Sequence, residues 1–72
     1  MAVSLVSMNE RTKVATFSYD NWSVDGDKLP KIGIEGKDAL SAIKGCSQGS
    51  YAVGTDGTMK TLNGDINEWI DY

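Results

Sequence analysis

The sequence contains a single cysteine, Cys46, and no histidine. One cysteine cannot form an internal disulfide bond, and a lone thiol does not make a zinc site. The lack of histidine removes the most common general base and the usual partner of a catalytic nucleophile. We therefore expect a protein that is not an enzyme and that has no catalytic, cofactor-binding or metal-binding residues.

Long apolar runs and an excess of basic residues are also missing. No apolar run approaches the roughly 20 residues of a membrane-spanning helix. The first residues, 1–5, lack the basic region and the long apolar segment of a signal peptide. Seven lysines and arginines stand against ten aspartates and glutamates, giving a net charge of −3, and the lysines lie singly rather than in a basic stripe. These features predict a cytosolic origin and no binding to membranes or nucleic acid.

The chain has 72 residues, of which 40% are hydrophobic, so it is one small globular domain. At this length the gain from apolar burial and the conformational entropy of folding nearly cancel. Disulfide bonds and zinc are excluded, which leaves association, with itself or with a larger body, as the remaining source of stability. We therefore expect a homo-oligomer or a multi-copy assembly.

The N-terminal part of the chain predicts a β-hairpin. Apolar and β-branched residues over 2–8 and 13–19 flank a polar stretch, 9–12, that is suited to a turn. The segment 20–36 is rich in turn residues and predicts a loop that crosses the sheet, held by Trp22 and by Ile32 or Ile34. The segment 38–44 is compatible with two turns of helix or with an extended strand.

The C-terminal part predicts a three-stranded meander over 50–55, 58–63 and 68–72. Asp56-Gly57 is typical of a two-residue type I′ hairpin turn. That turn places Val53 opposite Lys60 and Tyr51 opposite Leu62, and the following loop places Leu62 opposite Trp69 and Lys60 opposite Asp71. One face then carries Tyr51, Val53, Leu62 and Trp69. The chain as a whole is therefore predicted to be mainly β, or a small α+β domain, with an antiparallel sheet that contains an N-terminal hairpin and a C-terminal meander. The hairpin can cover one face of the meander, and a partner the other.

Three local patterns that could indicate a ligand site are better explained by structure. Asp25-Gly26-Asp27 lacks the further oxygen ligands of a calcium loop, and the glycines match no phosphate-binding pattern. Cys46 has only Lys44 as a nearby cation in sequence, which favours a buried structural thiol over a reactive one.

A partner surface is the remaining kind of site. The N-terminal run has apolar residues on both faces, as a strand does when it is central or pairs with another chain. Residues 1–12 are therefore an extended arm or a partner-pairing strand in one interpretation. Tryptophan is common at binding hot spots, and Trp22 lies in the turn-rich segment near Tyr19. The candidate interface residues are Val3, Leu5, Val6, Tyr19 and Trp22.

Several short motifs after about residue 13 resemble a group of small proteins from tailed bacteriophages and prophages. The outline of that group is an FYVD-like strand, an LP turn, a GK…LS…K.C..GS segment and a closing hairpin with LNG…W. The matching stretches here are 15–20, Leu29-Pro30, Gly36-Lys37, 40–52 and 62–69. Residues 1–12 fall outside the pattern.

The resemblance implies a small non-enzymatic structural protein of a phage virion, assembled in the host cytoplasm. Together with the small size, it favours an accessory protein on the capsid, with itself or a capsid protein as partner. Such a protein would be held by its sheet face and N-terminal strand. A position at the neck or tail, or a small phage-encoded inhibitor of a host protein, are the alternatives.

Overall fold

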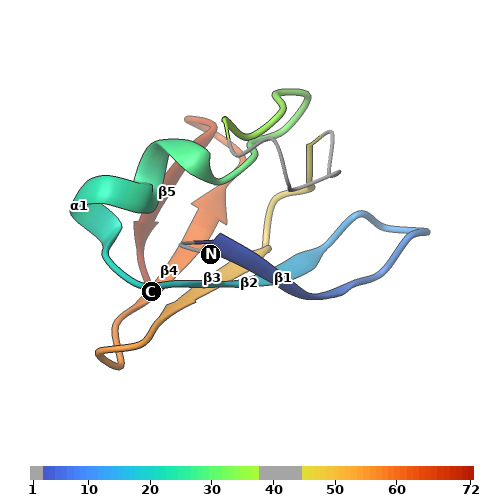
Figure 1. The fold of residues 1–72 in the computed structure, drawn as a ribbon. Coiled ribbons are helices and arrows are strands. Elements are labelled where there is room, and N and C mark those ends of the chain that lie inside the picture. Colours follow the sequence, from blue (N-terminus) through green and yellow to red (C-terminus); the bar gives the residue numbers. More distant parts are fainter. Residues whose placement is uncertain (1–2, 38–44) are drawn as a thin grey trace.

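The protein is described by a computed structural model that covers residues 3–37 and 45–72. Within these residues, five strands form one sheet, and one short α-helix, α1 (Trp22–Asp25), follows the second strand (Figure 1). The prediction of a mainly β protein is confirmed. The strands are β1 (Val3–Met8), β2 (Ala15–Tyr19), β3 (Tyr51–Gly54), β4 (Met59–Asn63) and β5 (Glu68–Asp71).

The strands lie in the order in which they occur along the chain, β1-β2-β3-β4-β5. The β1–β2 hairpin and the β3–β5 meander are both present, and all pairs are antiparallel except β2 with β3. The parallel β2–β3 pair was not expected. The hairpin does not take the covering position over the meander that the sequence allowed. The hairpin instead continues the sheet sideways, because β2 and β3 satisfy each other's backbone groups along the register Thr16↔Tyr51 to Tyr19↔Gly54.

The turn between β3 and β4 differs from the predicted type I′ turn. Gly54 accepts a hydrogen bond from the backbone N–H of Gly57, and its own N–H donates to Thr58. Gly57 has a φ of 91°, whereas Asp56 is not among the residues with positive φ. A type I′ turn needs positive φ at both positions. The loop therefore has three residues, with glycine in the left-handed conformation at its end, as in a type I turn followed by a bulge.

The longer turn shifts the register of β3 against β4 by one residue. Tyr51 pairs with Thr61 and Val53 with Met59, not with Leu62 and Lys60 as predicted. A shift of one residue moves a side chain to the other face of the sheet. Tyr51 and Val53 are therefore on the opposite face from Leu62 and Trp69. The predicted register of β4 against β5 is correct, with Lys60↔Asp71 and Leu62↔Trp69.

The segment after β2 lies over one face of the sheet (Figure 1). Asn21 begins α1 by accepting a hydrogen bond from the N–H of Ser23, and a turn of 3-10 helix over Gly26–Lys28 follows. Trp22 is half-buried, as expected of a residue that holds this segment. Ile32 and Ile34 do not hold it, because they are 39% and 54% exposed. Leu29 and Pro30 are the buried residues instead. The stretch 38–44, predicted as helix or strand, lies outside the described residues.

The hydrophobic core lies between this segment and the covered face of the sheet, called the inner face below. Phe17 and Trp69 meet edge to face with ring centroids 6.1 Å apart, and the indole N–H of Trp69 donates to the carbonyl of Pro30. Fixed ring geometry of this kind adds to the gain from burying the aromatic area. The inner face carries Ala15, Phe17, Tyr19, Ala52, Gly54, Leu62 and Trp69.

Candidate interaction surfaces

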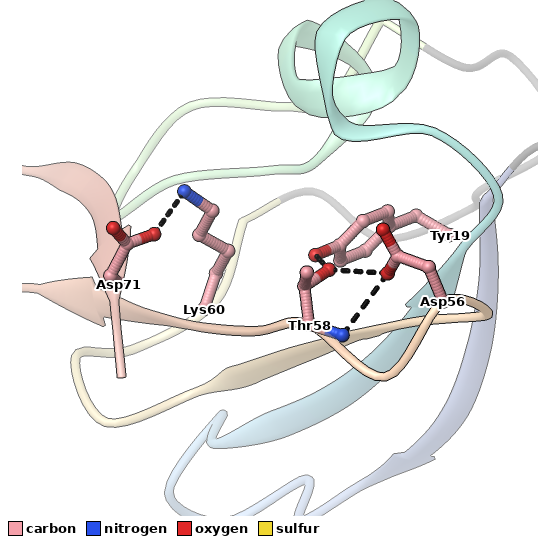
Figure 2. A network of polar contacts seen from close by, with 5 residues as sticks. All are labelled: Tyr19, Asp56, Thr58, Lys60 and Asp71. Atoms are coloured by element: carbon pink, nitrogen blue, oxygen red, sulfur yellow. Dashed lines mark hydrogen bonds and ion pairs between the residues drawn. The ribbon is translucent and has the colours of Figure 1, made fainter.

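A chain of hydroxyl and carboxylate groups joins the core to the β3–β4 turn (Figure 2). The Tyr19 and Thr58 hydroxyl oxygens are 2.6 Å apart, and the Thr58 hydroxyl lies 2.7 Å from Asp56 Oδ1. A carboxylate only accepts, so Thr58 donates to Asp56 and Tyr19 donates to Thr58. The hydrogen bonds from Thr58 lower the pKa of Asp56. These groups satisfy one another, and the network stabilises the turn.

Close backbone approach is required where the network meets β3. A Cβ atom placed on Gly54 would lie 2.5 Å from Thr58 Oγ1 and 2.9 Å from Cε2 of Tyr19. Both distances are shorter than real Cβ contacts, so a side chain at this position would displace the ring or the hydroxyl. Glycine at position 54 therefore allows Tyr19 to lie flat over the end of β3.

Lys60 extends from β4 toward α1 and ends in a charged contact with Asp71 of β5 (Figure 2). Its Nζ atom lies 4.8 Å from the centre of the Trp22 ring. Trp22 in turn packs edge to face on Tyr19, at 5.4 Å between centroids. The stem of Lys60 covers apolar surface while its ammonium group stays at the edge of the core, which is a common arrangement for lysine.

A second polar contact holds the start of α1. The Asp25 Oδ2 atom accepts hydrogen bonds from the backbone N–H groups of Asn21 and Asp20, at 3.0 and 3.2 Å. Lys28 Nζ lies 3.5 Å from the other carboxylate oxygen. The N–H of Asn21, followed by that of Asp20 and by Lys28, lowers the pKa of Asp25, and these effects outweigh the opposing effect of burial. Asp25 therefore has a structural role.

A shallow cleft of about 300 Å³ lies between α1 and β5. Its lining residues include the two tryptophans, Trp22 and Trp69, and the charged residues Asp27, Lys31 and Glu68. Aromatic rings beside carboxylates suit a cationic or amphipathic group from a partner. A small apolar ligand is less well matched, because charged groups interrupt the apolar wall.

The other face of the sheet, called the outer face below, is covered by no described element (Figure 1). Cross-strand pairing defines two rows of side chains on it. One row is Ser7, Thr16, Tyr51, Thr61 and Ile70, and the other is Ser4, Ser18, Val53, Met59 and Tyr72. The pair Asn63 and Glu68 lies on the same face, at the end of the sheet where the β4–β5 loop begins. Over β3–β5 these rows are mainly apolar, and over β1–β2 they carry only small hydroxyl residues.

Several large side chains of the outer face are open to solvent. Val53, Met59 and Ile70 are 36–38% exposed, and Tyr72 is 73% exposed. Tyr51 and Tyr72 meet edge to face at 5.3 Å, and a hydrogen bond with Tyr72 raises the pKa of Tyr51. Neither row contains a charged residue. Contiguous apolar surface of this kind marks an interaction site more often than chance exposure.

The predicted interface residues do not form one surface. Val3 and Tyr19 are each 1% exposed and belong to the core, so neither is available to a partner in the folded chain. Leu5 and Val6 of the edge strand β1 are 45% and 64% exposed. Trp22 is half-buried in the cleft wall. The interface itself stays a prediction, with Leu5, Val6 and Trp22 as the members that a partner can reach.

β1 is the edge strand that lacks charged side chains. Its sequence, VSLVSM, contains no proline or charged residue, whereas β5 at the other edge carries Glu68 and Asp71. A bulge interrupts the β1 ladder between Leu5 and Ser7. Bulges and charges are the usual means of keeping a sheet edge from pairing with other chains. The β1 edge has the bulge, and the β5 edge has the charged residues.

Sequence reasoning missed the outer face because it misassigned the turn. The signal for the three-residue loop is the spacing of Gly54 and Gly57, because such a loop ends in a residue with positive φ, which glycine adopts easily. With that loop, the alternation of Tyr51 and Val53 with Ala52 and Gly54 separates small inward residues from large outward ones.

Cys46 is buried, as predicted for a structural thiol. Its Sγ donates to the carbonyl of Pro30 at 3.4 Å, and burial raises its pKa. A raised pKa keeps the thiol protonated and unreactive at neutral pH. Within the described ranges there is no cluster of acidic residues and cysteine that could hold a metal ion, and no helix there is long and apolar enough to span a membrane.

No protein-family model matches the sequence, and no curated protein or solved structure shows a significant match to it.

Proposed function

We propose that this protein is a non-enzymatic accessory structural protein of a phage virion, bound to the capsid in many copies. The observation that carries the proposal is the uncovered outer face of the sheet, whose two central rows contain no charged residue. A domain that leaves Val53, Met59 and Tyr72 in solvent gains stability when a capsid protein or another copy of the chain covers them.

The assignment to a phage particle comes from the sequence motifs. The Leu29-Pro30 turn, the 40–52 segment and the 62–69 hairpin resemble small structural proteins of tailed phages. A symmetric shell presents the same binding surface many times, and contacts that are individually weak then add up when neighbouring copies touch. The same binding mechanism would apply if the protein were located at the neck or tail of the particle.

The test is the composition of purified particles. Mass spectrometry of virions from the source phage or induced prophage is expected to find this protein at tens to hundreds of copies per particle. Substitution of Val6 by Asp on the β1 edge, or of Val53 by Asp on the outer face, is expected to lower that number. Val24→Asp is the matched control, because Val24 is as exposed as Val6, at 64%, but belongs to α1 on the other side of the sheet.

Complete absence of the protein from particles that are otherwise intact would contradict the proposal. The second candidate is then a small phage-encoded inhibitor of a host protein. The cleft between α1 and β5 favours that function, since two tryptophans and the acidic residue Asp27 line it and suit a lysine or arginine of a partner. Trp22→Ala would weaken such a complex, whereas Val53→Asp would leave it unchanged.

A further inference from the structure

The outer face can be assigned a specific occupant from its charge. The chain carries a net charge of −3, yet the two rows of the outer face contain only apolar and hydroxyl residues, and Glu68 at the end of β5 is the one charged residue of the described strands that pairing places on this face. A surface that selects a foreign partner commonly uses charge complementarity for orientation. A surface whose centre carries no charge can meet an identical surface there without like-charge repulsion, and this favours a second copy of the same chain.

The distribution of side chains also suits a two-fold arrangement. Tyr51, Val53, Met59, Ile70 and Tyr72 are concentrated on β3–β5, with hydroxyl residues on β1–β2 beside them. In a two-fold dimer the same patch is used by both copies. An axis that passes over β4 places the apolar half of one sheet on the apolar half of the other. The acidic residue Glu68, which pairs with Asn63 at the end of β4, then lies at the rim.

The available area sets the strength of the contact. Five strands about 4.8 Å apart, each about 13–20 Å long, give a face with several hundred Å² of accessible surface. Stable interfaces bury about 800 Å² per partner, which is about a fifth of the 4477 Å² surface of this chain. The outer face is therefore at the small end of specific interfaces, and a dissociation constant in the micromolar range is expected.

We propose that two copies of this protein associate through their outer faces, forming a β-sandwich across the two-fold axis with Val53, Met59, Ile70 and Tyr72 in its centre. The two sheets would lie about 10 Å apart with their strands within about 30° of parallel, as in sandwiches within one chain. This inference goes beyond the virion role, because it does not depend on where the protein acts. It leaves the β1 edge and the cleft for a different partner.

Sedimentation equilibrium of the full chain tests the proposal. The wild-type protein is expected to be a dimer at concentrations above about 100 μM and to dissociate at low micromolar concentration. Val53→Asp and Tyr72→Glu are each expected to raise the dissociation constant at least about 100-fold, because every dimer would bury two like charges. Val24→Asp and Val6→Asp, on α1 and on the β1 edge, are expected to change it less than about 3-fold.

Tyr72→Glu keeps the test valid if Val53→Asp fails to fold. Tyr72 is 73% exposed and follows the last strand, so its replacement does not disturb the core. Circular dichroism and Trp69 fluorescence would show that each variant is folded. Amide chemical shifts that change on dilution should belong to β3, β4 and β5.

Two outcomes would overturn the proposal. One is a wild-type protein that remains monomeric at 1 mM. The other is a dimer that survives Tyr72→Glu but is lost in Val6→Asp, which would mean that the β1 edges pair instead. Dimerisation is measured with the isolated protein, whereas incorporation is measured in purified particles. A negative result in either experiment therefore contradicts only the proposal that it tests.

Discussion

At the scale of single residues, polar groups near the core are mostly satisfied by short local contacts. Tyr19, which spans from β2 to the β3–β4 turn, is 1% exposed, and its hydroxyl donates to Thr58. Thr58 then donates to Asp56. Each group in this network therefore has a defined partner, and removal of one member leaves the next with an altered set of hydrogen bonds.

Tyr19→Phe tests this network. The substitution keeps the ring against Trp22 and removes only the donor to Thr58, so the free energy of unfolding is expected to fall by about 1 kcal/mol. Urea unfolding measures the change. Tyr72→Phe is the comparison, because the Tyr72 hydroxyl interacts with Tyr51 at an exposed site, where a hydrogen bond contributes less. Equal effects of the two substitutions would show that the buried network adds nothing beyond an exposed hydrogen bond. Both variants should be compared at a concentration where the protein is monomeric.

The carboxylates predict how stability depends on pH. The pKa values of Asp25 and Asp56 are lowered in the folded chain by hydrogen bonds from Asn21 and Thr58. As the pH falls, the unfolded chain therefore binds protons at these two carboxylates before the folded chain does. The stabilisation is fully present at pH values well above 3.8, the ordinary pKa of aspartate, and is lost as the pH falls below that value.

Asp25→Asn is expected to lower stability at pH 7 and to flatten the acid limb of the curve, as measured by urea unfolding between pH 7 and pH 3. Asp27→Asn serves as the control, because the Asp27 side chain is 85% exposed. A control variant with the same flattening would contradict the assignment to Asp25.

At the scale of elements, the β3–β4 turn has the largest effect on the structure, because it sets the register of β3 against β4. The strands themselves were predictable from β-branched and aromatic residues and from turn residues between them. The β1–β2 hairpin, the presence of the β3–β5 meander, the 64–67 loop and the β4–β5 register follow from the sequence. The β3–β4 register did not, because Asp56-Gly57 fits a two-residue loop as well as a three-residue one, and the two differ by one residue. The close approach of Gly54 to the Tyr19 ring, which leaves no space for a side chain at position 54, decides between them.

Gly57 is the position at which the turn can be tested. Its φ of 91° is unfavourable for an L-residue, and nothing lies within 4 Å of a Cβ there. Gly57→Ala is therefore expected to cost about 1–2 kcal/mol through backbone strain alone. A synthetic chain with D-alanine at position 57, which prefers positive φ, should retain full stability by thermal unfolding. Equal losses with both alanines would indicate a steric cause instead.

At the scale of the whole molecule, the sheet is a single layer with one covered face. The accessible surface of 4477 Å² is close to the value expected of a folded chain of this mass. Compactness is therefore normal, and the exposed outer face is not a sign of loose packing. It reflects the placement of the hairpin beside the meander rather than over it, which leaves no described element on that side.

Stability is accordingly expected to depend on protein concentration. If two copies cover their outer faces, a 100-fold increase in concentration should raise the melting temperature by several degrees, about 5 °C for a domain of this size. Tyr72→Glu should abolish that dependence. Higher salt should tighten the dimer, since it screens repulsion between two chains of net charge −3. A melting temperature independent of concentration would argue that the wild-type chain folds as a monomer.

The sequence by itself determined the mainly β class, the two hairpins, the pairing of Lys60 with Asp71 and the burial of Cys46. These features depend on neighbours in sequence or on local turn chemistry. Only the tertiary structure decided that β2 pairs in parallel with β3, that Val3 and Tyr19 are core residues, and that Tyr51 and Val53 face outward. The physical reason is that residues far apart in sequence meet there. The face that a strand presents depends on what packs against it, which local patterns do not specify.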